Sequence, residues 1–384
     1  MTQKKYRYAL IGCGFFAQNH LHAWRQNPDV ELIATCDVDF EKAKLAAANF
    51  GGKAYASAEE LFANEDLDFV DIATTPPTHK YMVELAAKYG VAAICQKPLA
   101  WDMADAKSMV KAMSDKGLPF MVHENFRFQT PMRKIKEIID SGAIGRPFFG
   151  RISFRTAHDV YSAQSWLVES ERMIIVDVAV HLFDLARYFI GEPKTIFTSA
   201  HRVNPIIKGE DSATILMHME DATCIVDASY ETKSDHNTYP QTFVIIEGTK
   251  GKMMCSTYGA NPLLLPTSKT KDITVKESLY RVPGGDRGHY DNWVNACIAG
   301  FGSTEFKQLS SPFSIAGPLT ESVLMGNLAI RSYDYQVPRA GNANQLDYPG
   351  RGIKLLWDGP NMKITNFEPA NQFVTRNYRP GYTL

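Results

Sequence analysis

The sequence lacks long apolar runs, clustered cysteines and an excess of either charge. No stretch reaches the ~18 apolar residues of a membrane span. The apolar run behind the basic N-terminus is too short for a secretion signal, so we expect neither feature. The six cysteines are scattered without a C-x-x-C pair, which argues against a disulfide framework and favours reduced thiols in a cytoplasmic protein.

Lys and Arg number 41, Asp and Glu number 42, and no long basic run appears. This balance argues against nucleic acid or an anionic membrane as a main partner. The length of 384 residues suggests two domains. An apolar fraction of 45% is ordinary for a globular protein with a sizeable core.

Strands and helices alternate up to about residue 125, which predicts an α/β fold with a parallel sheet and helices on both faces. Ligands of such sheets bind at the C-terminal strand ends, so the residues directly after each strand become candidates. The expected strands are residues 8–11, 32–35, 69–72, 92–95 and 119–122, and the expected helices are 16–26, 40–50, 78–89 and 103–116.

The remainder is typical of a second α/β domain with a mostly antiparallel, open sheet. We therefore expect domains at residues 1–125 and 126–384, with an arm-like tail from about residue 337. The expected strands of the second domain are 148–156, 195–201, 213–219, 223–230, 242–247 and 252–256, and its expected helices are 131–141, 177–190, 289–299 and 319–332.

A glycine-rich turn follows the first expected strand. It reads G-x-G-x-x-A, with Gly12, Gly14 and Ala17 at the fixed positions, the pattern of the phosphate-binding turn of a dinucleotide-binding fold. Gly12 permits the tight turn, Gly14 lets a pyrophosphate approach the backbone, and Ala17 lets the helix pack closely. The start of that helix, with Phe15 and Phe16, would face the phosphates. The motif therefore predicts a redox cofactor.

Asp37 follows the second strand, about 20 residues past the glycines, which is the spacing of a carboxylate that binds an adenosine ribose. The alternative is that Asp37 caps the next helix, although Asp39 could do so instead. A carboxylate would repel a 2′-phosphate, so NAD is favoured over NADP. Nearby Lys42 and Lys44 make that preference moderate.

The loop after the third expected strand contains Thr74, Thr75, Pro76 and His79. Small hydroxyl residues and prolines shape a rigid strand-end loop, so these four are candidates for cofactor binding, and Thr78 is the expected helix N-cap. The alternatives are a plain strand-to-helix turn and a His79 that is merely a solvated residue of the first helical turn.

Lys97 stands just after the strand at 92–95, between Gln96 and Pro98. A lysine at the C-terminal end of a parallel strand points at the ligand crevice, and Pro98 restricts its backbone. A lysine partly withdrawn from water can exchange protons near neutral pH, so Lys97 is a catalytic candidate. The alternative is an ordinary surface lysine.

Three polar residues share one stripe of the helix expected at 177–190. Asp177, His181 and Asp184 lie at i, i+4 and i+7, beside an apolar stripe. This stripe could face a pocket, with Asp177 orienting His181 and His181 contacting a substrate hydroxyl. The alternatives are a solvated helix face and a metal site, but no further metal ligands stand out, so we expect no metal.

Together these motifs resemble the glucose-fructose oxidoreductase, inositol dehydrogenase and rhizopine-catabolism family, abbreviated Gfo/Idh/MocA, over nearly the whole chain. Besides the glycine turn, the resemblance rests on Lys97-Pro98, Asn125-Phe126-Arg127-Phe128, Asp177-x-x-x-His181-x-x-Asp184, Pro318-Leu319-Thr320-Glu321 at an expected helix start, and Trp357-Asp358.

The resemblance implies a Rossmann domain, an α/β domain whose sheet mediates oligomers, and NAD(P)-dependent oxidation or reduction of sugar or cyclitol hydroxyls. The family's catalytic lysine corresponds to Lys97, and its Asp and His to Asp177 and His181. Two features depart from the family pattern. Gln96 replaces the usual Glu, which keeps a hydrogen bond to a cofactor ribose but removes a charge beside Lys97. Met173-Ile174-Ile175 stands where many relatives have glycines.

We interpret the chain as an NAD-dependent oxidoreductase that transfers a hydride between nicotinamide and a hydroxyl-bearing carbon of a sugar, glycoside or cyclitol. Two rivals remain: an NAD-using glycosidase that oxidises its sugar transiently, and a non-catalytic sugar- or NAD-sensing regulator. The further residues expected at the site are Gln96, Lys97 and Asn125 on the cofactor, and Arg127, Arg155, His158, Asp159, Tyr161 and Trp166 on the substrate.

The second half supplies several apolar strands but few helices to cover them. Soluble monomers rarely tolerate a large open apolar face. We therefore expect a homo-oligomer with an even number of subunits, a dimer, tetramer or hexamer, paired through this sheet. The tail, rich in Pro and Asn, could reach across to a neighbour.

Overall fold

The structure is a computed structural model that describes residues 5–157, 164–232, 242–256, 262–266, 273–279, 287–359 and 361–374. The described residues form two compact units, one within residues 1–130 and 280–320, the other within 131–279 and 321–383. Helix α12 (Phe313–Tyr333) passes from the first unit to the second after Thr320.

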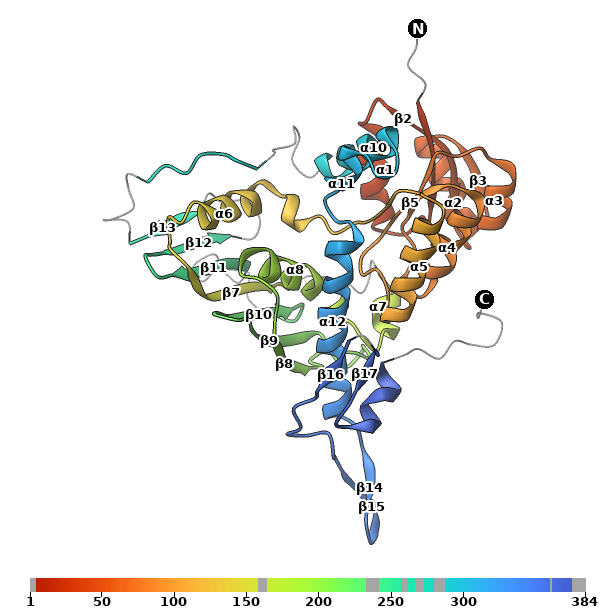
Figure 1. Ribbon diagram of the computed structural model, residues 1–384. Helices are drawn as coiled ribbons and strands as arrows, with labels where there is room; N and C mark the ends of the chain where they lie inside the picture. Colours follow the sequence, from red (N-terminus) through yellow and green to blue (C-terminus); the bar gives the residue numbers. More distant parts are fainter. Residues whose placement is uncertain are drawn as a thin grey trace. The chain divides into compact units, whose positions relative to one another are not determined.

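The N-terminal unit contains a six-stranded parallel sheet with the order β3-β2-β1-β4-β5-β6 (Figure 1). The predicted Rossmann fold is therefore confirmed. The sequence analysis missed only the short strand β3 and the short helix α3 of this alternation. The strands are β1 Tyr6–Ile11, β2 Val30–Cys36, β3 Lys53–Tyr55, β4 Phe69–Ile72, β5 Ala92–Cys95 and β6 Phe120–Val122. The helices are α1 Ala17–Arg25, α2 Phe40–Phe50, α3 Ala58–Asn64, α4 Pro76–Tyr89 and α5 Met103–Asp115.

The N-terminal unit also includes two helices from far along the chain, α10 (Arg287–Ala299) and α11 (Thr304–Lys307). The expected division at residue 125 placed them in the second domain. The difference has a packing reason, because Trp293 of α10 is buried in one apolar cluster with Trp24 and Phe69. Burying aromatic side chains of this size contributes strongly to stability. Helix α10 therefore belongs to the N-terminal core although more than 150 residues separate it from the strands there.

The C-terminal unit is built on a seven-stranded sheet with the order β13-β12-β11-β7-β10-β9-β8. Its neighbouring strands are antiparallel except β7 and β10, which run parallel, so the sheet is mostly antiparallel, as predicted. The strands are β7 Pro147–Arg155, β8 Thr195–His201, β9 Ser212–His218, β10 Thr223–Ser229, β11 Thr242–Gly248, β12 Lys252–Ser256 and β13 Leu263–Leu265.

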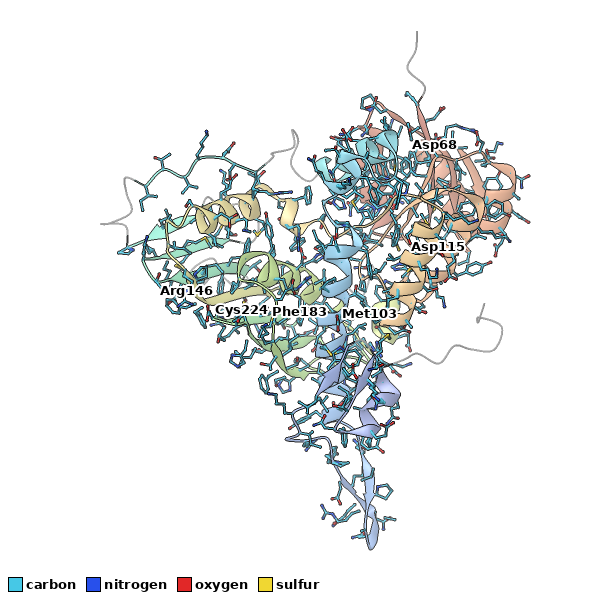
Figure 2. All side chains as sticks on the ribbon, viewed as in Figure 1. Asp68, Met103, Asp115, Arg146, Phe183 and Cys224 are labelled. Atoms are coloured by element: carbon cyan, nitrogen blue, oxygen red, sulfur yellow. The ribbon has the colours of Figure 1, made fainter. Side chains whose placement is uncertain are left out.

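One face of this sheet is fully covered and the other is not. Cys224 and Val226 point to the covered face and are buried, and helix α8 (Val180–Phe189) packs against β7 and β10 there. A Cβ atom on Gly150 would lie 2.3 Å from Cδ1 of Ile190, so the glycine admits the end of this helix. Figure 2 labels Phe183 of α8 and Cys224 of the sheet below it.

The opposite face of the sheet carries residues that are only partly buried. Paired neighbours across four strands place Arg151, Ile225, Leu216 and Ile245 on this face. Arg151 forms a salt bridge of 2.8 Å with Asp227. The open face is therefore a mixture of apolar side chains and compensated ion pairs, since Lys252 and Glu247 also pair there at 2.9 Å.

Helix α12 begins earlier than the sequence predicted. The expectation was a helix start near Pro318, but the helix begins at Phe313 and Pro318 lies inside it. Buried Ala316 and Leu319 anchor the helix on both sides of the proline. The cost of one missing backbone hydrogen bond is therefore offset by burial.

The tail after α12 forms a hairpin of β14 (Val337–Arg339) and β15 (Asn342–Asp347) that extends away from its unit (Figure 1). The chain then returns through β16 (Trp357–Asp358) and β17 (Lys363–Ile364). Ile364 and Ala370 pack on Leu328 of α12. Within the described part of the tail, the hairpin has the exposed, arm-like character that the sequence suggested.

All six cysteines carry free thiols, and five of them are buried. Among the helices of the described residues, none has the length and apolar content needed to cross a membrane. The C-terminal unit also contains α6 (Thr130–Asp140) and the short α7 (Trp166–Glu169).

Candidate functional site

The glycine turn has the geometry that its motif predicts. Gly12 adopts φ = +94°, and a Cβ atom there would lie 2.6 Å from the carbonyl oxygen of Ala73. Only glycine fits such a close approach of two loops in the left-handed region. Gly14 differs, because a Cβ atom there would meet no atom within 4 Å. The loops after β1 and β4 therefore touch at Gly12, while the backbone at Gly14 is open.

An open backbone at Gly14 suits a dinucleotide. The adjacent Phe15 and Phe16 are exposed by 58% and 42%, and Ala17 is buried where α1 packs on the sheet. The first backbone N–H groups of a helix have no partner within it and can bind phosphate oxygens. The residues present therefore fit the pyrophosphate of NAD.

Asp37 joins the end of β2 to the glycine turn. Its carboxylate accepts hydrogen bonds from the backbone N–H of Cys13 at 2.7 Å and of Asp39 at 2.9 Å. Asp39, not Asp37, caps α2 by accepting from the N–H of Glu41. The alternative that Asp37 is only a helix cap is therefore wrong. Its two oxygens keep lone pairs for ribose hydroxyls, so ribose binding stays a prediction that the geometry supports.

The loop after β4 is organised by His79. Its Nδ1 lies 3.1 Å from the carbonyl oxygen of Leu99, and its Nε2 lies 3.1 Å from that of Thr74. The ring is buried, which lowers its pKa, so the solvated alternative is wrong. His79 links the loops after β4 and β5, and its contact with a cofactor stays a prediction.

The expected cap at Thr78 is wrong. Helix α4 begins at Pro76 with Thr75 at the N-cap position, because proline is well suited to the first helical turn. The hydroxyl of Thr78 instead donates toward Thr74 Oγ1 at 2.8 Å and the carbonyl oxygen of Thr75 at 2.9 Å. Thr74, Thr75 and Pro76 therefore form one tied loop beside the glycine turn.

Lys97 lies directly after β5 and is half-buried, so it is not an ordinary surface lysine. Its backbone N–H donates to Oε1 of Gln96 at 2.7 Å, and Gln96 itself is buried. The backbone of Lys97 is thus held by its buried neighbour Gln96.

Asp177 lies in a π-helical turn, Ile175–Ala179, that precedes α8. Turns of this type are rare and frequent at functional sites. The hydroxyl of Tyr230 donates to Asp177 Oδ2 at 2.6 Å, and both side chains are buried. The sequence analysis missed Tyr230. A signal was present, because Tyr230 continues the alternation that turns Cys224 and Ala228 toward the helix-covered face.

The helix that carries His181 is buried on all sides. His181 and Asp184 are both buried, and so are their apolar neighbours Leu182 and Leu185. The expected apolar stripe is buried as predicted, the solvated alternative for the polar stripe is wrong, and a pocket beside the polar stripe stays a prediction. Polar groups in such a helix need specific partners, which makes them candidates for binding rather than solubility.

Glu210 was also missed by the sequence analysis. Its buried carboxylate accepts from the backbone N–H of Met173 at 3.1 Å and of Ile175 at 3.3 Å, so it holds the start of the π-helical turn. Burial raises the pKa of Glu210 to about 7, against these hydrogen bonds and the nearby Arg172, which lower it. No sequence pattern connects residue 210 with 173, so only the fold reveals this contact.

The remaining predicted residues are distributed over both units. Asn125 and Arg127 lie at a 3₁₀ turn, Phe126–Phe128, in the N-terminal unit. Arg155 ends β7 and Trp166 opens α7 in the C-terminal unit. His158, Asp159 and Tyr161 lie outside the described residues. The substrate role of these residues stays a prediction.

Two family models match the chain. One, described as "Oxidoreductase family, NAD-binding Rossmann fold", matches residues 6–124, and the "GFO/IDH/MocA C-terminal domain" matches residues 132–254. The chain belongs to the Gfo/Idh/MocA oxidoreductase family. The resemblance of the sequence motifs to this family is therefore confirmed.

Among curated relatives, the D-apiose dehydrogenases of Paraburkholderia graminis and Rhizobium rhizogenes are 47% and 48% identical. Their matches span 66% and 67% of this chain, and 68% and 75% of theirs. A solved oxidoreductase from Agrobacterium radiobacter, in complex with NAD⁺, L-tartaric acid and magnesium, shares 39% identity and a TM-score of 0.73. That similarity covers 83% of this chain and 94% of the other.

These similarities confirm the predicted enzyme class. The chain is an NAD-dependent dehydrogenase that acts on hydroxyl groups of the sugar or cyclitol type. NAD is its cofactor, and neither the glycosidase nor the regulator is favoured, because the relatives are dehydrogenases.

The two motif glycines should respond differently to substitution. Gly14→Ala should leave thermal unfolding of the cofactor-free protein unchanged, because a Cβ atom meets nothing there, but should weaken NAD binding at least tenfold by filling the approach to the backbone. Gly12→Ala should destabilise the cofactor-free protein itself. Differential scanning fluorimetry and calorimetric NAD titration measure both effects. Unchanged NAD affinity in Gly14→Ala would contradict the placement of the pyrophosphate.

Glu210 should make stability depend on pH. Because its folded pKa is raised from 4.5 to about 7, its contribution is fully present below about pH 4.5 and is lost as the pH rises through 7, by roughly 3 kcal/mol. Glu210→Gln should therefore gain stability relative to the native protein between pH 5 and pH 8. Urea unfolding followed by circular dichroism measures the difference. The exposed Glu220→Gln is the control, and parallel pH curves for all three proteins would disprove the assignment.

Proposed function

We propose that the chain oxidises D-apiose, or a sugar closely similar to it, with NAD⁺. The identity of 47–48% with two D-apiose dehydrogenases supports this substrate more than any other observation. The inositol 2-dehydrogenase of Rhizobium meliloti is more distant, at 30% identity over 51% of this chain. A cyclitol is therefore the second candidate.

The reaction needs one base and one hydride acceptor. NAD⁺, when bound, accepts the hydride from the carbon that bears the reacting hydroxyl. Lys97 or His181 takes the hydroxyl proton as the C–H bond breaks and the carbonyl forms, so the substrate loses two electrons and two hydrogens. Lys97 is half-buried at the end of β5 and His181 is buried in α8, and both can hold a proton at a nitrogen atom.

Asp177 acts on the substrate side of the C-terminal unit. Its carboxylate is already oriented by the Tyr230 hydroxyl, and we assign it to a sugar hydroxyl or to His181. A preoriented carboxylate costs little to arrange during binding. Arg127, Arg155, His158 and Trp166 are proposed as further substrate contacts.

Cofactor contacts are assigned by element. We assign Gly12, Gly14, Phe15 and Phe16 to the pyrophosphate and Asp37 to the adenosine ribose. The strand-end loops complete the assignment with Thr74, Thr75, Pro76, His79, Gln96, Lys97 and Asn125. These roles follow from the convergence of the loops after β1, β2, β4 and β5 at one sheet edge.

A substrate screen tests this proposal. Reduction of NAD⁺ at 340 nm should be fastest with D-apiose in a panel of pentoses, hexoses, inositols and glycosides. Lys97→Ala and His181→Ala should each lower kcat by about 10²–10⁴, as expected for an acid–base group, and NAD affinity should change little in His181→Ala. The exposed His201→Ala is the control. Near-normal turnover in both variants would disprove the catalytic roles of Lys97 and His181. An absence of activity on D-apiose would disprove the proposed substrate.

We also propose a homo-oligomer, in the cytoplasm, that pairs through the open face of the C-terminal sheet. Partly buried Leu216, Ile225 and Ile245 on that face, together with the exposed β14–β15 hairpin, support such pairing. The buried free thiols support a reducing compartment.

The assembly is tested by light scattering. The native chain should show at least twice its monomer mass of 42.9 kDa, and Ile225→Arg should reduce that mass because it places a charge in the paired face. Leu45→Arg, at an exposed position of α2, should not. A single monomeric species of the native chain at micromolar concentration would disprove the oligomer.

A further inference from the structure

A buried carboxylate lies beneath the strand ends of the N-terminal unit. Asp71, in β4, has no exposed surface. Its Oδ2 accepts from Trp24 Nε1 at 2.6 Å and faces His20 Nδ1 at 2.8 Å, and its Oδ1 faces His123 Nε2 at 3.2 Å. Trp24 and His20 come from α1, and His123 directly follows β6.

These partners keep Asp71 ionised. Burial alone would raise its pKa, but the facing His20 and His123 lower the pKa well below the usual range. Burial and the neighbouring His20 lower the pKa of His123 to about 4, so His123 is neutral at neutral pH and donates one hydrogen bond from Nε2.

The other groups packed against this cluster carry no charge. Burial raises the pKa values of Cys95 and Tyr8, so both are protonated. Burial also lowers the pKa of His289, whose ring lies 5.2 Å from that of His123. Tyr290 contributes a ring 5.8 Å from His20. Asp71 is therefore the charge that orients the surrounding donors.

The orientation continues from His20 to Lys97. Gln96 Nε2 is an amide nitrogen and can only donate, so His20 Nε2, which faces it, is the acceptor and the proton on Nδ1 faces Asp71. Gln96 Nε2 lies 3.1 Å from His20 Nε2 and donates to it. Gln96 Oε1 is then turned toward the Lys97 backbone, whose N–H donates to it at 2.7 Å. All donors in this chain of hydrogen bonds point toward Asp71, a directed assignment that follows from the network.

This direction gives a reason for the unusual Gln96. A carboxylate at position 96 would present an acceptor to His20 Nε2, which is itself an acceptor in this arrangement. The pair would then need an additional proton inside a buried cluster, which is costly. The amide of Gln96 donates to His20 Nε2 without one.

We propose that His20 and Asp71 are positioning residues for Lys97, acting through Gln96 to fix the strand-end loop on which Lys97 lies. The proposal rests on the catalytic role of Lys97 proposed above. Neither residue needs to touch substrate or cofactor. A lysine held by a buried, directed chain keeps its geometry through the reaction, and misplacement of a reacting group by about 1 Å can cost about 100-fold in rate.

The same three side chains, His20, Asp71 and His123, place potential metal-ligand atoms within 4.8 Å of one another. The Trp24 N–H, however, is donated to the Asp71 oxygen that faces His20, which suits an acceptor of hydrogen bonds rather than a metal ligand. A metal is therefore an outcome of the test and not the proposal.

The test compares variants that break and restore the series of hydrogen bonds from Asp71 through His20 and Gln96 to Lys97. His20→Leu removes the acceptor for Gln96, whereas His20→Gln can return one through its side-chain oxygen. In the full-length protein with NAD⁺ and D-apiose, or the fastest sugar of the panel, His20→Leu should lower kcat about 10- to 100-fold with KM and the NAD dissociation constant nearly unchanged. His20→Gln should recover most of the loss. His22→Leu, exposed on the same helix, is the matched control.

A double-variant analysis shows whether the hydrogen bonds from Asp71 to Gln96 act on catalysis through Lys97. Gln96→Leu should lower kcat as His20→Leu does, and the two together should be no worse than either alone, because both break one chain. In a Lys97→Ala background, His20→Leu should have no further effect. Multiplying effects in either pair would overturn the proposal, and Gln96→Leu keeps the test valid if His20→Leu fails to fold.

The outcomes separate this inference from the proposed function. If Lys97→Ala alone keeps normal turnover, the catalytic role of Lys97 is wrong. If Lys97→Ala is inactive but His20→Leu, Gln96→Leu and the native protein share one kcat, only the positioning role is wrong. Stoichiometric divalent metal in the purified protein that is lost in His20→Gln, detected by mass spectrometry, would replace the chain with a metal site and overturn the inference.

Discussion

The ionised carboxylate of Asp71, enclosed in the parallel sheet, is the constraint to which the polar interior of the N-terminal unit conforms. A buried charge is tolerated only when donors surround it, and here the donors come from α1 and from the end of β6. Satisfying Asp71 therefore ties α1 to β4 and β6. Through His20 the same requirement reaches Gln96 at the end of β5. Structural stability and site geometry thus depend on one set of hydrogen bonds.

The C-terminal unit solves a similar problem with different groups. Asp177 receives the Tyr230 hydroxyl, and Glu210 receives the backbone at the start of the π-helical turn. Both carboxylates are buried beside a helix that is itself buried nearly all round. A π-helical turn shifts the side chains that follow it relative to an ordinary helix, and Glu210 supplies backbone partners where that irregular turn begins. In both units, buried side chains that are shielded from solvent hydrogen-bond the polar candidate site residues or their backbone.

The two glycines of the motif illustrate how one pattern serves two purposes. Gly12 is required by the fold, because two loops approach each other too closely for any side chain. A Cβ atom on Gly14 would meet no protein atom within 4 Å, so the fold does not require glycine there, and we propose that cofactor binding does. A sequence pattern contains both kinds of glycine without distinguishing them, and only the distances separate structural need from binding need.

The local sequence by itself determined the parallel sheet, the dinucleotide turn, the positions of Lys97, Asp177 and His181 along the chain, and the family. These depend on strand and helix periodicity and on residues close together in sequence, where short-range physics dominates. The tertiary structure alone decided that α10 completes the first core, that Tyr230 and Glu210 hold the π-helical turn, and that His20 connects Asp71 to Gln96. Such contacts join residues at least 35 positions apart in the sequence. Side chains that far apart meet only after the elements that carry them have packed.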